Sequence, residues 1–159
     1  MEEEDKTYQY ALKLLSSRKR SIKEIEEKLR KKFPSQKEKI APLIEKFKKI
    51  GYLDDQDFAE AWIKDRLKFN PRGIKQIERE LRNKGVEKEI IRKALEKHYP
   101  VSLEKEIMEK LARKKWEREK NVELIKRMER VYRYLLYRGF PAKEVREIIS
   151  KLAKEKTVF

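Results

Sequence analysis

The sequence predicts an all-α protein built as a tandem array of three three-helix repeats, about nine helices in all. Apolar residues recur at intervals of three and four, which is the period of a helix buried on one face. Only four Gly and five Pro occur in 159 residues. One motif also returns after 52 and then 51 residues, as IKEIEEKLR from Ile22, IKQIERELR from Ile74 and IKRMERVYR from Ile125. This period predicts repeats over residues 1–52, 53–100 and 101–159.

Three apolar stripes mark the helices of the first repeat. Their residues are Tyr8, Ala11, Leu12 and Leu15, then Ile22, Ile25 and Leu29, then Ile40, Leu43, Ile44 and Phe47. Ser21 with Glu24, and Ser35 with Glu38, have the spacing of a capping box, so we expect a helix to begin after each serine. Pro42 lies inside the third stripe and removes a backbone hydrogen bond, which predicts a kink or a later helix start.

The second and third repeats follow the same order. Asn70 and Pro71 begin the middle helix of the second repeat, and Gly85 ends it. Residues 101–138 contain no Gly or Pro, and we place the break between the first two helices of the third repeat near Asn121. The apolar stripes span residues 58–67, 74–81 and 90–95 in the second repeat and residues 103–111, 125–136 and 145–152 in the third.

Composition excludes most kinds of enzyme. The chain has no Cys and a single His, His98, so it lacks thiol nucleophiles, disulfides and a cluster of soft metal ligands. It also contains no Gly-rich phosphate loop and no Ser/His/Asp set. We therefore predict a protein that is not an enzyme and that uses no cofactor and no metal.

The chain shows no signal for a membrane. No apolar run reaches the roughly 18 residues of a membrane helix, and the start MEEED does not resemble a secretion signal. We expect a cytoplasmic monomer without membrane contact.

A formal net charge of +15 favours a polyanionic partner, such as nucleic acid or a nucleoprotein assembly. The excess is densest over residues 110–138, which hold 11 basic and 4 acidic residues. The alternative is an ion-paired surface of the kind found in thermophilic proteins, because 46% of all residues are charged.

Three carboxylates, Asp54, Asp55 and Asp57, lie together in the stretch GYLDDQDF. They precede the apolar stripe that begins at Phe58, where caps and first-turn acids complement free amides and the positive end of the helix dipole. A site for a hard cation needs about six oxygens that converge from a loop, and no second acidic cluster with loop spacing is present. We interpret the three aspartates as a helix start and not as a metal site.

The repeated middle helix predicts a mainly basic strip beside its apolar face. On a helical wheel, three cations of the second repeat share one side, and so do three cations of the third, where Tyr137 continues the strip. Glu27 interrupts the strip in the first repeat. Such cations either bind phosphate or acidic surface, or they pair with glutamates at helical spacing on a solvated face. The strip residues are Lys75, Arg79 and Arg82, and then Lys126, Arg130, Arg133 and Tyr137.

A second basic stretch, RKKWEREK, surrounds Trp116. This indole either stacks on a nucleobase or covers a small core. The candidate contacts there are Arg113, Lys114, Lys115 and Arg118, and Arg72, in the Pro-Arg that precedes the second repeat's middle helix, completes the predicted set.

Four stretches, taken in order, resemble the RecX family of regulators of the RecA recombinase: YALKLLSSRKRSIKEIEEKL, GYLDDQDFAEAWIKDRL, NPRGIKQIERELRNKGV and YRYLLYRGFPAKEVREII. The resemblance covers most of residues 8–152. It implies an elongated, curved array of three-helix units. It also implies a protein that binds the RecA filament on single-stranded DNA and suppresses ATP hydrolysis, strand exchange and SOS-related activity, with no catalysis of its own.

Two hypotheses follow from the sequence. The first is a protein-interaction module that regulates a recombinase filament, and the second is a direct DNA-binding helical-repeat protein that acts through its basic strips. Salt separates them, because a phosphate-dominated binder loses affinity steeply as salt rises.

Overall fold

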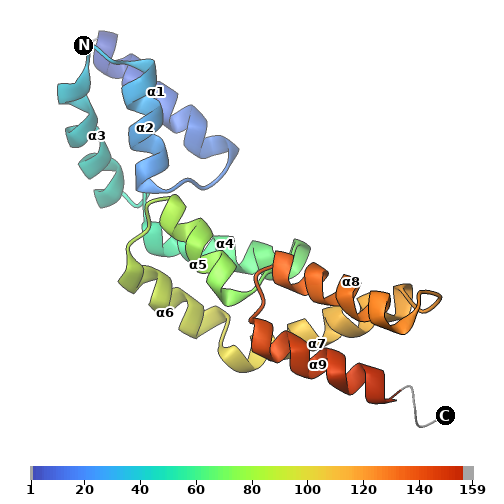
Figure 1. The fold of residues 1–159 in the computed structure, drawn as a ribbon. Coiled ribbons are helices and arrows are strands. Elements are labelled where there is room, and N and C mark those ends of the chain that lie inside the picture. Colours follow the sequence, from blue (N-terminus) through green and yellow to red (C-terminus); the bar gives the residue numbers. More distant parts are fainter. Residues whose placement is uncertain (1, 156–159) are drawn as a thin grey trace. The chain divides into compact units, whose positions relative to one another are not determined.

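The computed structural model describes residues 2–155, and the side chains from residue 6 onward. This part of the chain forms nine α-helices and no strand (Figure 1), which confirms the all-α prediction. The helices are α1 (Glu2–Ser17), α2 (Ile22–Lys32), α3 (Lys37–Lys49), α4 (Asp55–Phe69), α5 (Ile74–Asn83), α6 (Lys88–His98), α7 (Val101–Arg118), α8 (Leu124–Tyr137) and α9 (Ala142–Glu155). The elongated, curved shape stays a prediction.

Helix starts follow local chemistry in some places and depart from it in others. Ser21 caps α2 with the predicted capping box, since its side chain accepts from the Glu24 amide. The box predicted at Ser35 is wrong, because Gln36 is the N-cap of α3 and provides no side-chain bond. Helix α3 begins at Lys37 and continues through Pro42, so the later start is wrong as well. The break near Asn121 is confirmed between α7 and α8.

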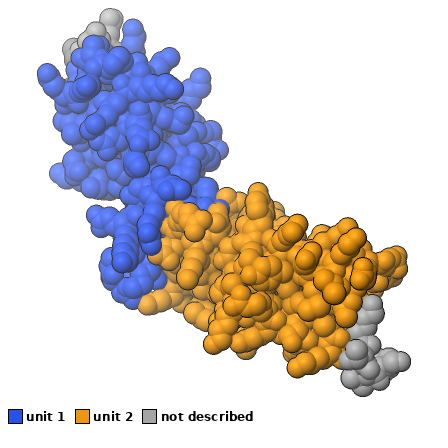
Figure 2. Space-filling model, viewed as in Figure 1, with its two compact units in different colours: residues 1–62, 80–94 blue, residues 63–79, 95–159 orange. Residues whose placement is uncertain are grey.

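Residues 1–62 and 80–94 form one compact unit, called unit 1, and residues 63–79 and 95–159 form unit 2 (Figure 2). The helices of the middle repeat, α4, α5 and α6, each contribute residues to both units. The repeat boundaries 1–52, 53–100 and 101–159 stay predictions, because the two units follow packing and not the repeats.

The core of the first repeat lies inside unit 1. Helices α1, α2 and α3 pack together there around Phe47, which no solvent reaches. Burying these side chains stabilises the unit by roughly 1.5–3 kcal/mol for each large apolar residue. The other stripe residues are partly buried and pack against this core. The buried residues are six members of the predicted stripes together with Leu53, namely Ala11, Ile25, Leu29, Ile40, Ile44, Phe47 and Leu53.

The core of the third repeat lies inside unit 2, where α7, α8 and α9 pack together. Its register on α8 differs from the prediction. Ile125 was expected on the apolar face but is 66% exposed, while Val131 and Leu135 are fully buried. Val131 and Leu135 are buried on α8 as Ile77 and Leu81 are buried on α5. The motif that begins at Ile125 therefore resembles the motif that begins at Ile74 in composition, but its residues do not take the equivalent buried positions.

Candidate functional site

The three aspartates have three separate roles in unit 1. Asp54 caps α4, because its Oδ1 accepts from the amides of Gln56 and Asp57 at 3.0 and 3.2 Å, which confirms the predicted helix start. Asp57 pairs with Lys19 at 2.6 Å in an exposed position. The third carboxylate, Asp55, accepts from the Ile22 amide at 2.9 Å and so caps α2, a helix of the preceding repeat.

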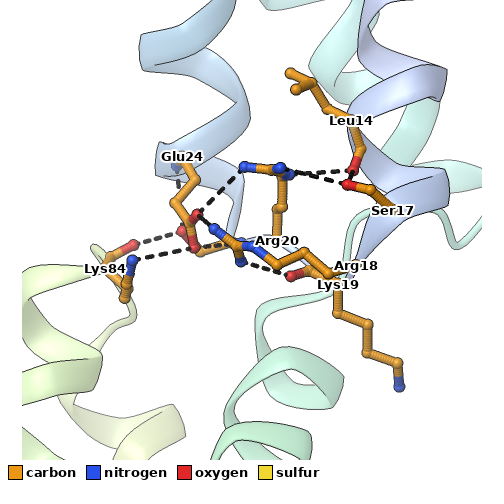
Figure 3. A network of polar contacts seen from close by, with 8 residues as sticks. Leu14, Ser17, Arg18, Lys19, Arg20, Glu24 and Lys84 are labelled. Carbon is orange, nitrogen blue, oxygen red and sulfur yellow. Dashed lines mark hydrogen bonds and ion pairs between the residues drawn. The ribbon is translucent and has the colours of Figure 1, made fainter.

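The contact of α2 with the end of α5 is here called the first joint, and its core residues are Ser21, Ile22, Asp55 and Lys84. The Ser21 hydroxyl donates to the Lys84 carbonyl at 2.6 Å. Around it, Glu24 receives ion pairs from Arg18 at 2.6 Å and from Arg20 and Lys84 at 3.9 Å (Figure 3). Burial acts to raise the pKa of Glu24, but the hydrogen bond from Arg18 and the charges of Lys84 and Arg18 outweigh it, and the pKa is lowered.

The matching contact in unit 2, between the start of α5 and the end of α8, is called the second joint. Its core residues are Gly73, Ile74, Glu104, Arg138 and Gly139. The Gly73 amide donates to the Arg138 carbonyl at 2.8 Å, and the Ile74 amide donates to Glu104 at 2.6 Å. Burial raises the pKa of Glu104 more than this bond lowers it. Glu104 therefore caps α5 as Asp55 caps α2.

Two arginines hold the segment before α5 against the end of α8. Arg138 donates to the Asn70 side chain at 3.1 Å and to the Pro71 carbonyl at 3.2 Å, and its guanidinium lies 4.6 Å from the ring centre of Tyr134. The guanidinium of Arg72 lies 5.6 Å from the ring centre of Tyr137. The structure thus brings together Arg72 and Tyr137, two predicted contact residues from distant parts of the sequence.

The predicted strip on α5 is exposed. Lys75, Arg79 and Arg82 lie opposite the buried Ile77 and Leu81, as expected from 3.6 residues per turn. Lys75 and Arg79 make no ion pair or hydrogen bond within the described residues. The first-repeat position Lys23 instead pairs with Glu27 at 3.9 Å, so the strip is partly neutralised there.

On α8 the strip is exposed as well, despite the changed register. Lys126, Arg130, Arg133 and Tyr137 lie on the side away from Val131, and Tyr137 is 81% exposed. Arg130 pairs with Glu119 at 2.8 Å. Hydrogen bonds from Arg130 and from Lys115 lower the pKa of Glu119. Within the described part of the chain, Lys126 and Arg133 have no such partner.

The RKKWEREK stretch is mainly structural. Trp116 is buried in the core of unit 2, so of the two readings of Trp116, base stacking is wrong and the core role is confirmed. Arg113 pairs with Glu155 at 2.9 Å and Glu109 at 3.3 Å. Lys115 pairs with Glu119 at 3.1 Å. Lys114 and Arg118 are exposed and have no partner among residues 6–155.

Sequence reasoning missed two buried charged residues of unit 2. Arg127 is stacked on Trp116, with its guanidinium 4.0 Å from the ring centre, and donates to the Trp116 carbonyl at 2.9 and 2.6 Å. Burial lowers its pKa, although Glu117 and Glu119 oppose this. Glu104 is the other. Arg127 lies four residues before the buried Val131, and Glu104 lies four residues before the buried Met108. This helical spacing was the only feature of the sequence that could have predicted their burial.

The described residues show neither a metal site nor a membrane-spanning helix. Among them, no group of three or more His, Asp or Glu is placed to hold a metal ion. None of their helices is long and apolar enough to cross a membrane.

The fold and the exposed cations define a class: an all-α protein of tandem three-helix units with basic helix faces. Family models for the first, second and third three-helix domains of RecX match residues 8–36, 54–95 and 103–149. The chain belongs to the RecX family.

Relatives agree with this assignment. The regulatory protein RecX of Pelodictyon phaeoclathratiforme is 35% identical over 143 residues, covering 90% of this chain and 86% of the relative. That of Oceanobacillus iheyensis is 35% identical over 147 residues, covering 92% of this chain but 53% of the relative, so the chain spans about half the length of some relatives. The crystal structure of RecX from Lactobacillus salivarius superposes with a TM-score of 0.80 at 28% identity, covering 96% and 97% of the two chains.

Proposed function

We propose that this protein regulates a RecA recombinase by binding its filament on single-stranded DNA and inhibiting ATP hydrolysis and strand exchange, with suppression of SOS-related activity as the outcome. Membership of a family of regulatory proteins over all three repeats is the observation that carries the proposal. The protein would act by binding and not as an enzyme, in the cytoplasm and as a monomer.

The exposed cations support a polyanionic target. A filament of protein on DNA presents phosphates together with acidic protein surface, and cations without intramolecular partners are free to bind both. Arg79, Lys126 and Arg133 are of this kind within the described residues, and Lys75 makes no ion pair or hydrogen bond there, although its charge acts on Glu104. We expect them to contribute to the affinity for the filament.

The test is ATP hydrolysis by the cognate RecA on single-stranded DNA, titrated with this protein at moderate and at high salt. Inhibition that persists where direct DNA binding has faded is expected, because apolar and shape contacts with the filament survive screening. No effect on hydrolysis, together with tight and salt-sensitive DNA binding, would replace this proposal by the DNA-binding hypothesis.

A variant with Lys75, Arg79 and Arg82 changed to Ala identifies the contribution of α5. All three side chains are exposed, so we expect an unchanged helical circular dichroism spectrum and weaker inhibition. Unchanged inhibition by the folded variant would remove these residues from the candidate surface.

A further inference from the structure

The strongest unexplained feature of the molecule is the pair formed by Arg72 and Tyr137 in unit 2. Tyr137 is the most exposed of the large hydrophobic side chains in the described residues, at 81%. An exposed aromatic ring of this size contributes nothing to the core. Its one ring contact in the described residues is the Arg72 guanidinium at 5.6 Å, which leaves most of the ring open to solvent.

Arg72 is itself incompletely satisfied. A guanidinium has five N–H donors, yet that of Arg72 donates no hydrogen bond to any residue that the structure describes. Its Nε is buried and has no partner there. A buried donor without a partner is unfavourable and calls for an explanation. The terminal nitrogens of the guanidinium are not among the buried atoms, and a bound anion would supply acceptors for these donors.

The backbone that carries Arg72 is firmly held. Its carbonyl accepts from the Tyr99 hydroxyl at 2.8 Å, and the neighbouring Pro71 carbonyl accepts from Arg138. Gly73 is bonded to the Arg138 carbonyl at the end of α8, next to Tyr137. The backbone segments that carry the ring and the guanidinium are therefore held together at one joint, which favours binding because less backbone freedom is lost.

Further cations continue from this pair along α8. Arg133 and Lys126 share the exposed face with Tyr137 and have no partner within residues 6–155. Tyr137 and Lys126 are about 16 Å apart along the helix axis. Phe69, 74% exposed, precedes Asn70, which Arg138 holds at the same joint. Aromatic rings beside a row of cations are the features with which proteins bind single-stranded nucleic acid.

We propose that Arg72 and Tyr137 form a binding site for single-stranded DNA. A nucleobase stacks on the open face of the Tyr137 ring, the Arg72 guanidinium binds the adjacent phosphate, and Arg133 and Lys126 bind the phosphates that follow along α8. A nucleobase is favoured over an acidic protein segment because a base can stack on the open face of the Tyr137 ring, whereas a carboxylate does not stack on an aromatic ring. This inference does not rest on the RecA proposal.

The test measures the binding of a fluorescein-labelled oligo(dT) of about 16 nucleotides by fluorescence anisotropy. A second oligonucleotide of the same length carries abasic sites, which keep the phosphates and remove the bases. Wild-type protein should bind oligo(dT) more tightly than the abasic strand. Tyr137→Ala should bind oligo(dT) about 5- to 150-fold more weakly than wild type, since stacking on an aromatic side chain contributes about 1–3 kcal/mol per base.

Variants separate stacking from charge. Tyr137→Phe should keep the preference for oligo(dT), and Tyr137→Ala should lose it. Arg72→Gln and Arg133→Gln should each reduce the slope of log affinity against log salt by about 0.7, the value for one phosphate on a single strand. Matched controls are Tyr52→Ala, an exposed tyrosine of unit 1, and Arg146→Gln, an exposed arginine of α9, and both should bind as wild type does.

Two outcomes would overturn the proposal. The first is equal affinity of wild-type protein for the two strands, and the second is unchanged binding of oligo(dT) by Tyr137→Ala. If that variant has also lost RecA inhibition, the ring is assigned to a protein contact. Failure of wild-type protein to inhibit RecA, with base-dependent binding intact, would contradict the proposed function alone.

Discussion

The first and second joints solve the same structural problem with different chemistry. In each, the start of a middle helix is held by the end of the next repeat's middle helix and is capped by a carboxylate from that repeat. The first joint uses the Ser21 hydroxyl and a network of ion pairs, whereas the second uses the Gly73 backbone and stacked arginines. The repeat therefore preserves a geometry and not a set of residues.

In the third repeat the corresponding position holds Arg127, counted from the buried Val131 and Leu135. Its side chain bonds to the Trp116 carbonyl of α7, within the same repeat. Ser21 and Gly73 are small, so the end of another helix packs directly against them. The large Arg127 side chain occupies the corresponding space in the third repeat. The comparison of the two joints gives four predictions, which follow from the largest effect to the smallest.

The largest effect is expected from Gly73→Ala. An added Cβ would lie 2.1 Å from the Gly139 carbonyl oxygen and 2.8 Å from the Phe140 amide nitrogen, both backbone atoms that cannot rotate away. Overpacking of this kind is at the upper end of 1–3 kcal/mol, so we expect a loss of about 3 kcal/mol in the free energy of unfolding. Urea unfolding followed by Trp116 fluorescence in a Trp62→Phe background reports on unit 2.

Gly51→Ala is the matched control for Gly73→Ala. Gly51 has a positive φ of 82°, but nothing lies within 4 Å of an added Cβ, so only backbone strain of about 1 kcal/mol is expected. Equal losses for the two variants would show that close packing is not what requires glycine at the second joint.

Ser21→Ala should have the next largest effect, about 1–2 kcal/mol, since it removes both the α2 cap and the bond to the Lys84 carbonyl. Urea unfolding followed by circular dichroism measures it. Ser21→Gly sharpens the comparison, because it places the residue of the second joint in the first. If Ser21→Gly is as stable as wild type, the hydroxyl is dispensable and the two joints are chemically interchangeable.

Much of the fold followed from the sequence because helix periodicity is a local property. Ile25, Leu29, Ile77 and Leu81 are buried as their spacing predicts. The register of α8 was not predicted, since Arg127 counts as a surface residue in any local pattern and becomes buried only when Trp116 packs against it. The contact of Arg72 with Tyr137 depends on the packing of α8 against the segment before α5. Helical periodicity is a local pattern and cannot predict this packing.

The two joints also differ in their response to pH. Burial raises the pKa of Glu104, so the folded protein holds a proton that the unfolded chain loses near pH 4.3. The associated stability is full below that pH and is lost as pH rises through the higher pKa of the folded state. Glu104→Gln keeps an acceptor for the Ile74 amide, and we expect it to gain stability relative to wild type between pH 4 and pH 7.

In the first joint, the pKa of one carboxyl group is raised and the pKa of another is lowered. Burial raises the pKa of Asp55 in the same way as that of Glu104, whereas the Arg18 and Lys84 contacts leave the pKa of Glu24 lowered. The stability that Glu24 provides is present above its unfolded pKa and is lost as pH falls through its folded value. Glu24→Gln should therefore be destabilising at pH 7 and nearly neutral in acid, opposite to Glu104→Gln. Urea midpoints of both variants at the two pH values decide this.

The smallest effect is expected at the edge of the first joint, from Asp57→Asn. Its ion pair with Lys19 is short, but both side chains are more than half exposed, and water and salt screen such pairs. We expect a loss of less than about 0.5 kcal/mol that disappears in 1 M salt. Asp54→Ala is the matched comparison, because it removes the α4 cap and should cost about 1 kcal/mol at any salt concentration. If Asp57→Asn were the more damaging change, the surface ion pair and not the cap would hold the start of α4.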